Sequence, residues 1–204
     1  MTIALIDYGA GNLHSVHNAL VKAGAQDVTI TADPDIVARA DRIVLPGVGA
    51  FRACRDGLYN LPGVVEAMSE AVHARATPFL GICVGMQLLA DRGEEFGIHE
   101  GLGWIGGTVR RIEPTDPAIK VPHMGWNTVT PATPHPLIEA GEAYFLHSYH
   151  FDAADRGDVV ATTDHGGPLV AAVARDTIIG VQFHPEKSQR YGLSFLSRFL
   201  DWTP

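Results

Sequence analysis

Short apolar runs alternate with amphipathic segments through the first half of the chain. Such runs predict strands, and segments with an apolar face at helical spacing predict helices. The predicted strands cover residues 2–7, 27–31, 42–45 and 77–82. The predicted helices cover residues 12–23 and 62–74, with a short helix from Asp33. This alternation indicates an α/β fold with a doubly wound, mostly parallel sheet flanked by helices.

After Gly101 the pattern changes to a series of strand-like segments. They cover residues 108–112, 128–130, 144–149, 159–163, 169–174 and 177–183. We expect them to supply additional antiparallel strands in the second half. Residues 189–202 carry Leu193, Leu196 and Leu200 on one helical face and predict a closing helix.

Composition limits the domain organisation and the partners. The 204 residues are 46% hydrophobic, and no proline-rich, repetitive or highly charged stretch suggests a linker, so we expect a single domain over residues 1–204. Because 15 Lys and Arg stand against 23 Asp and Glu without a basic stripe, we expect no nucleic-acid partner. No signal peptide or bilayer-spanning run is evident, so we expect a cytoplasmic protein with no membrane partner and two free cysteines.

The segment from Gly81 to Gln87, GICVGMQ, sets Cys83 between two glycines where a predicted strand turns into a helix. It matches the G-x-S-x-G nucleophile elbow with sulfur in place of oxygen. A lone cysteine is more commonly a small buried apolar residue, so the hypothesis of a nucleophile depends on finding a base. Cys54 lacks the flanking glycines, and we expect it to pack in the core.

One histidine of the ten stands at the end of a predicted strand beside a carboxylate. The apolar run 177–183 leads into His184, Pro185 and Glu186. If this segment is extended, Glu186 lies on the same side as His184 and can orient its ring, as the third member of a nucleophile, base and orienter triad. Because ligands bind at the carboxyl ends of parallel strands, we expect Cys83 and His184 to meet there. Without the cysteine elbow, the tripeptide fits an ordinary strand end followed by a turn and gives only weak support for a triad.

A glycine-rich turn, Pro46 to Gly49, follows the strand 42–45. Glycine lets a backbone N–H turn toward a reacting carbonyl, so we assign Gly47, Val48 and Gly49, with the N–H of Val84, to an oxyanion hole. The spacing alone fits a plain turn as well.

Other histidine and glycine patterns carry no prediction of a ligand. Gly9 and Gly11 match half of a dinucleotide fingerprint, but His14 occupies the third glycine position. The closely spaced histidine pairs, 14 with 17 and 147 with 150, have no further ligands at metal spacing. We therefore expect neither a metal nor a cofactor.

The cysteine elbow, the His184–Glu186 tripeptide and the PGVG turn together resemble the class I glutamine amidotransferases, which have a flavodoxin-like fold. Four further motifs, DYGAGN, KVPHMGWN, LHSYH and HPEKS, resemble the glutaminase subunits of imidazole glycerol phosphate synthase nearly end to end. The resemblance implies that Cys83 is the nucleophile, His184 the base and then the acid, and Glu186 the orienter. Glutamine would be hydrolysed to glutamate and ammonia.

The resemblance also implies a partner, a (β/α)8-barrel cyclase subunit. This subunit would use the channelled ammonia to make imidazole glycerol phosphate and aminoimidazole carboxamide ribotide in histidine biosynthesis. The residues implied for holding glutamine are Gln87, Glu95, Ser148 and Tyr149. Those implied for the partner interface are Asn12, His123, Met124, Trp126, Asn127 and Lys187. From the residues alone, His123, Met124 and Trp126 could be core, but we expect them in a proline-flanked loop that suits a protein interface.

Three alternatives remain open from the sequence. The chain could be the glutaminase subunit of a different synthase, a cysteine hydrolase acting on γ-glutamyl peptides, or a non-catalytic scaffold subunit of the same fold. Glutamate release measured with and without the cyclase separates them, because a scaffold releases none and an independent hydrolase ignores the partner.

Overall fold

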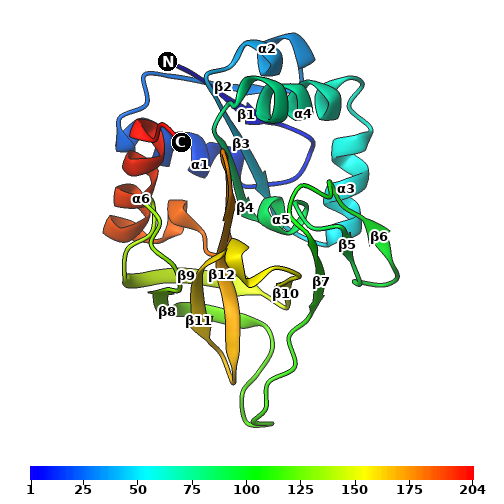
Figure 1. Ribbon diagram of the computed structural model, residues 1–204, viewed down its shortest axis with the longest axis vertical. Coiled ribbons are helices and arrows are strands. Elements are labelled where there is room, and N and C mark those ends of the chain that lie inside the picture. Colours follow the sequence, from blue (N-terminus) through cyan, green and yellow to red (C-terminus); the bar gives the residue numbers. More distant parts are fainter.

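The computed structural model describes all 204 residues, and a nine-stranded sheet runs through the molecule (Figure 1). The strands lie in the order β2-β1-β3-β4-β13-β12-β11-β8-β9. The parallel part comprises β2 (Asp27–Thr31), β1 (Thr2–Ile6), β3 (Arg42–Gly47), β4 (Phe79–Cys83) and β13 (Ile178–Val181). The antiparallel part comprises β12 (Pro168–Arg175), β11 (Val159–Asp164), β8 (His123–Pro131) and β9 (Gly141–His147). This architecture confirms the predicted fold class.

Helices cover both faces of the parallel part. Figure 1 shows α1 (Leu13–Ala23) and α6 (Gln189–Asp201) on one face, with α3 (Phe51–Tyr59) and α4 (Val64–Arg75) on the other. The short α2 (Pro34–Arg39) packs beside α4. Because both faces are covered, β3 and β4 are buried at every position and their sequences show no polar alternation. The continuous apolar runs of the first half follow from this double burial.

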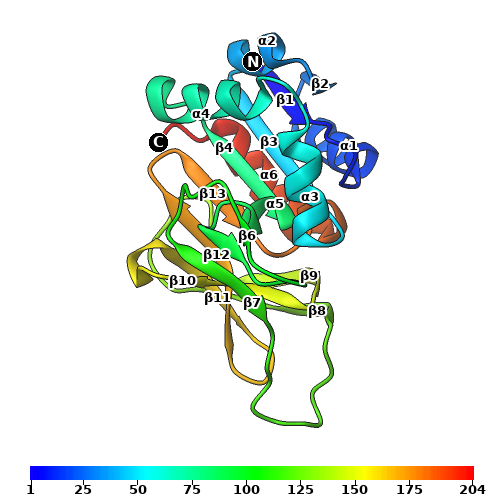
Figure 2. The ribbon, with the colours of Figure 1, turned by 90° about the vertical axis from the view of Figure 1, so that its right-hand side faces the viewer.

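A second, four-stranded sheet packs against the antiparallel part, in the order β10-β7-β5-β6 (Figure 2). Its strands are β10 (Tyr149–Ala153), β7 (Gly107–Arg111), β5 (Arg92–Gly93) and β6 (His99–Glu100). The single strand predicted over 144–149 is therefore wrong. The chain leaves the large sheet at His147 and enters the small one at Tyr149, so Ser148 lies where it changes sheets.

Several local elements differ from the sequence prediction. Helix α3 was not predicted, although Phe51, Cys54 and Leu58 form a buried face at helical spacing. The helix after Cys83, α5 (Val84–Gln87), has one turn only. The two remaining short helices are η1 (Arg156–Asp158) and η2 (Pro185–Lys187). No helix of the protein combines the length and apolar character needed to cross a membrane.

Candidate active site

The chain turns sharply at Cys83, where β4 ends and α5 begins. Cys83 has a φ of 55°, in the left-handed region that non-glycine residues seldom occupy. The flanking glycines make this corner possible because neighbouring main-chain atoms lie too close to them for a side chain to fit. A Cβ on Gly81 would lie 2.6 Å from the carbonyl oxygen of Gly85, and one on Gly85 would collide with the carbonyl of Leu45. Strain of this kind is typical of nucleophile elbows.

His184 reaches the same edge of the sheet as Cys83. Strand β13 pairs in parallel with β4, with Val181 opposite Ile82, so the two strands end side by side. His184 Nδ1 lies 2.8 Å from Glu186 Oε1, and both side chains are almost fully buried. The expected reason for this contact was wrong, because residues 185–187 form the 3₁₀ turn η2 rather than an extended segment.

The surroundings of His184 favour its protonated ring. Burial lowers the pKa of His184, but the interactions with Cys83 and Glu186 outweigh it and raise the pKa to about 9. The ring therefore carries a proton at neutral pH, next to the sulfur of Cys83. A protonated imidazole in this place can hand its proton to a leaving group.

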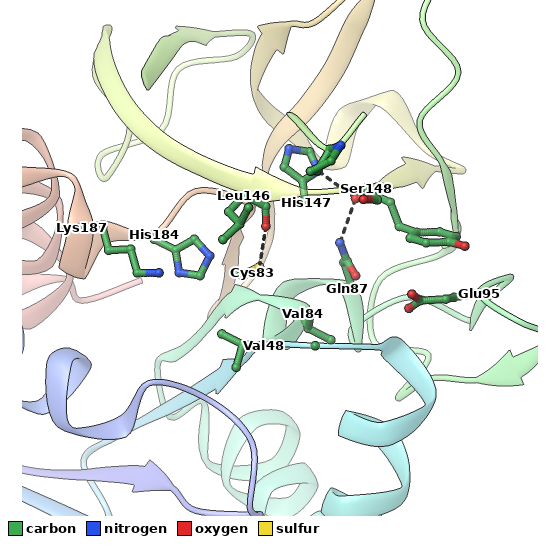
Figure 3. Close-up of a pocket in the computed structure, with 13 residues that line it drawn as sticks. Val48, Cys83, Val84, Gln87, Glu95, Leu146, His147, Ser148, His184 and Lys187 are labelled. Atoms are coloured by element: carbon green, nitrogen blue, oxygen red, sulfur yellow. Dashed lines mark hydrogen bonds between the residues drawn. The ribbon is translucent and has the colours of Figure 1, made fainter. Parts of the chain in front are cut away.

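A pocket of about 280 Å³ opens beside Cys83 (Figure 3). In Figure 3, His184 and Lys187 lie on one side of Cys83, and Gln87 and Glu95 lie on the other. Thirteen residues line the pocket: Val48, Gly49, Cys83, Val84, Gln87, Glu95, Pro122, Leu146, His147, Ser148, Tyr149, His184 and Lys187. All the residues expected to hold glutamine are among them. Gly47, expected in the oxyanion hole, is buried at the end of β3 and does not line the pocket.

An amide pair that the sequence analysis missed connects the pocket wall to Cys83. Gln87 Nε2 donates to the carbonyl of Tyr149 and to Gln182 Oε1, both at 3.0 Å. Gln182 Nε2 in turn lies 3.7 Å from Cys83 Sγ. Gln182 is fully buried, and a lone amide within the apolar run before His184 was the signal that could have identified it.

Two further side chains, of Ser188 and Glu95, hold the main chain around the pocket. Ser188 Oγ donates to the carbonyl of His184 at 2.7 Å and accepts from the N–H of Tyr144 at 2.9 Å. Across the pocket, the N–H of Phe51 donates to Glu95 Oε2 at 2.7 Å. Ser188 was not predicted, because its role depends on contacts across the sheet that no local pattern shows.

Four of the residues expected at a partner interface lie on β8, and their side chains divide between its two faces. This segment was expected to be a loop, but it is a strand and therefore alternates. Met124 and Trp126 are 65% and 48% exposed, whereas His123 is 3% exposed, so the surface position considered for His123 is wrong. His123 instead lies 2.9 Å from His147, nitrogen to nitrogen. Asn127 also turns inward, with Nδ2 2.7 Å from the carbonyl of Asp164.

Asn12 and Lys187 complete the set expected at the interface. Asn12 is exposed at the start of α1. Lys187 Nζ lies 5.8 Å from the ring centre of Tyr144. We use the name apolar patch for Met124, Trp126 and Leu146, which are exposed on β8 and β9 with Met124 directly opposite Leu146.

An elbow cysteine beside a buried histidine–glutamate pair, at the carboxyl edge of a parallel sheet, defines a class of protein. A model of the family described as glutamine amidotransferase class-I matches residues 4–201. The chain therefore belongs to the class-I glutamine amidotransferases.

Full-length relatives narrow this assignment. "Imidazole glycerol phosphate synthase subunit HisH" of Zymomonas mobilis is 62% identical, over 100% of this chain and 97% of the relative. The HisH subunits of Bradyrhizobium diazoefficiens and Caulobacter vibrioides are each 54% identical over 100% of this chain, and over 100% and 99% of the relatives. Within the class-I enzymes, the chain thus belongs with the HisH subunits of imidazole glycerol phosphate synthase, and the alternative of a different synthase is set aside.

Solved structures agree with the fold. A crystal structure of a glutamine amidotransferase has a TM-score of 0.76 at 16% identity, covering 98% of this chain and 99% of that one. The glutaminase domain of Trypanosoma brucei CTPS, solved with bound acivicin, has a TM-score of 0.68 at 18% identity, covering 100% of this chain and 95% of that one.

Proposed function

We propose that the chain hydrolyses glutamine through Cys83, His184 and Glu186. The sulfur of Cys83 attacks the side-chain amide of glutamine, and backbone N–H groups of the Pro46–Gly49 turn and of Val84 take the developing negative charge. The protonated ring of His184 holds the proton that came from the Cys83 thiol, and it delivers this proton to the departing ammonia. Water hydrolyses the resulting glutamyl thioester with His184 as base, which releases glutamate and leaves the His184 ring protonated beside the sulfur again.

The observation that carries this proposal is the buried contact between His184 and Glu186 beside the strained Cys83 elbow, on one pocket. A carboxylate in this place fixes the ring and supports its positive charge. Gln87, Glu95, Ser148 and Tyr149 line the same pocket, and we assign them to the binding of glutamine.

The test removes the sulfur in the assembled enzyme. In Cys83→Ala we expect glutamine-driven synthesis to fall by about 10³-fold or more, because removing a nucleophile leaves only binding and electrostatic contributions. Ammonia-driven synthesis should stay within about twofold of the parent, because it bypasses the glutaminase site. Loss of both activities would show that Cys83 has an architectural role, and retention of both would refute the proposed nucleophile.

We further propose that the ammonia passes to a (β/α)8-barrel cyclase subunit. That subunit makes imidazole glycerol phosphate and aminoimidazole carboxamide ribotide in histidine biosynthesis. The apolar patch supports this partner surface, because Leu146 belongs to the patch and also lines the pocket. A partner seated there would adjoin the place where ammonia is released, which keeps ammonia from protonation in solvent.

Two alternatives remain. A cysteine hydrolase acting on γ-glutamyl peptides would ignore the cyclase. The other alternative is a scaffold without turnover. It predicts no glutamate release with or without the cyclase, whereas the proposed function predicts release that rises when the cyclase is present. We also propose that residues 1–204 act as one domain, since one cluster of 53 buried apolar residues extends through both parts of the large sheet. The cytoplasmic location stays a prediction.

A further inference from the structure

Two buried hydrogen-bond donors contact the Pro46–Gly49 turn from the side of the core and do not line the substrate pocket. Tyr8, two residues past the end of β1, donates its hydroxyl to the carbonyl of Pro46 at 2.5 Å. Cys54, on α3, directs its thiol to the carbonyl of Val48 at 3.3 Å. The side chains are 6% and 0% exposed, and neither takes part in the proposed chemistry.

Two glycines allow Tyr8 to lie against the turn. A Cβ on Gly47 would come within 2.8 Å of the Tyr8 hydroxyl. A Cβ on Gly57, in the middle of α3, would come within 2.6 Å of the Tyr8 carbonyl oxygen. Neither glycine has a positive φ, so each serves close packing rather than a turn. Strand β3 and helix α3 therefore both pack closely against Tyr8.

Both donors keep their hydrogens at neutral pH. Burial, followed by the neighbouring Cys54, raises the pKa of the Tyr8 hydroxyl. Burial raises the pKa of the Cys54 thiol to about 11. A buried carbonyl that lost such a donor would be left unsatisfied, and the peptide that carries it would be free to rotate.

The contacts have a consequence for the N–H groups of the turn. The carbonyls of Pro46 and Val48 point inward, and they belong to the peptides on either side of the Gly47–Val48 peptide. In a trans peptide the N–H points opposite to the carbonyl, so the N–H of Gly49 points away from Cys54. The N–H groups of Val48 and Gly49 donate to no other group of the protein, and both residues line the pocket.

We propose that Tyr8 and Cys54 are positioning residues for the oxyanion hole, which hold the turn from beneath so that the N–H groups of Val48 and Gly49 stay available to the charged intermediate. This inference rests on the proposed glutaminase function. Because the oxyanion exists only after attack, misplacing its donors lowers kcat and leaves the binding of glutamine unchanged.

The experiment compares Tyr8→Phe with Tyr191→Phe in the complex with the cyclase. Each change removes one hydroxyl bound to a backbone carbonyl, but Tyr191 bonds to Glu139 away from the pocket. We expect Tyr8→Phe to lower the glutamine-driven kcat by roughly tenfold, below the 10²-fold to 10³-fold typical of removing an oxyanion donor itself. KM for glutamine and ammonia-driven synthesis should stay within about twofold, and Tyr191→Phe should match the parent.

Cys54 supplies a second, independent pair of variants. Cys54→Ala removes the donor and should lower kcat, while Cys54→Ser restores a donor and should recover a large part of the loss. Alkylation of Cys83 by iodoacetamide does not use an oxyanion hole, so its rate should be unchanged in Tyr8→Phe and Cys54→Ala.

An unchanged kcat in Tyr8→Phe and Cys54→Ala would overturn the inference, as would a raised KM at constant kcat. Equal losses of glutamine-driven and ammonia-driven activity would also overturn it, because they would show a structural role. These outcomes are distinct from failure of the proposed function, which would appear as glutamine-driven activity surviving in Cys83→Ala.

Discussion

At the scale of single residues, the chemistry of the site depends on side chains whose charge is set by burial and by one or two neighbours. His184 is protonated because its partners outweigh its burial. His123 and His147 show the opposite balance, since burial lowers the pKa of His123 to about 4 and that of His147 to about 3. The same side-chain type thus performs two tasks in one protein, a proton carrier and a neutral structural link.

Glu186→Gln tests the first of these tasks. The neutral amide no longer supports the positive ring, so the pKa of His184 should fall from about 9. The proton needed by the leaving ammonia is lost as pH rises through this pKa, so the alkaline decline of glutamine-driven kcat/KM should move down by about one pH unit or more. A pH profile measures this shift, with the exposed Glu70→Gln on α4 as control. An unmoved decline would contradict the assignment of Glu186 as orienter.

The buried pair His123 and His147 predicts a loss of stability in acid. His147 Nδ1 donates to the carbonyl of Tyr149 at 2.8 Å, which leaves its other nitrogen to accept from His123. The folded pKa values lie below the unfolded value of about 6.5, so the unfolded chain binds these protons first. Stability present above pH 6.5 should therefore fall as pH drops toward 4, by on the order of 1 kcal/mol or more.

Urea unfolding at pH 7 and at pH 5 measures this loss. The variant His123→Gln has no titrating ring at this position, so the difference in unfolding free energy between the two pH values should shrink. A difference as large as that of the parent would show that other groups cause the acid sensitivity.

At the scale of elements, the elbow between β4 and α5 depends on backbone approach more than on helix formation. Helix α5 has one turn, so the free energy of the corner comes from the packing of Gly81 and Gly85 against neighbouring main chain. The sequence identified this corner because its glycine spacing is local. It did not identify α3, which packs below the Pro46–Gly49 turn, because Gly57 is required there by contact with Tyr8, a residue distant in sequence.

Gly85→Ala tests the elbow. Its Cβ would collide with the carbonyl of Leu45, so α5 and β3 must move apart, and we expect a destabilisation of roughly 1–3 kcal/mol, the usual range for overpacking. Glutamine-driven activity should fall by more than stability alone explains, because Cys83 moves. Gly106→Ala is the matched control, since its Cβ would meet its nearest neighbours at 3.6 and 3.8 Å, ordinary contact distances. Equal thermal midpoints for the two variants would contradict the close approach.

At the scale of the whole molecule, the isolated chain leaves the apolar patch next to the pocket exposed. Met124, Trp126 and Leu146 are 65%, 48% and 38% exposed on neighbouring strands. Exposed apolar side chains gathered in this way are typical of interaction surfaces.

Trp126→Glu tests this surface. A carboxylate in an apolar interface stays unpaired, so we expect the affinity for the cyclase to fall by about 10-fold to 100-fold, in line with the loss of an aromatic interface residue. Val21→Glu is the control, because Val21 is also 48% exposed but lies near the far end of α1. Titration calorimetry measures both, and equal affinities would remove the patch from the interface.

The sequence by itself determined the order of strands and helices in the first half apart from α3, the elbow at Cys83 and the motif at His184. Periodicity and turn chemistry act between residues close in the chain, so these features can be predicted from the sequence alone. The tertiary structure alone decided that the chain changes sheets at Ser148, that His123 turns inward, and that Gln182, Ser188, Tyr8 and Cys54 support the site. Each of these depends on the register of strands and on contacts between distant segments, where packing against a partner element, rather than local preference, selects the conformation.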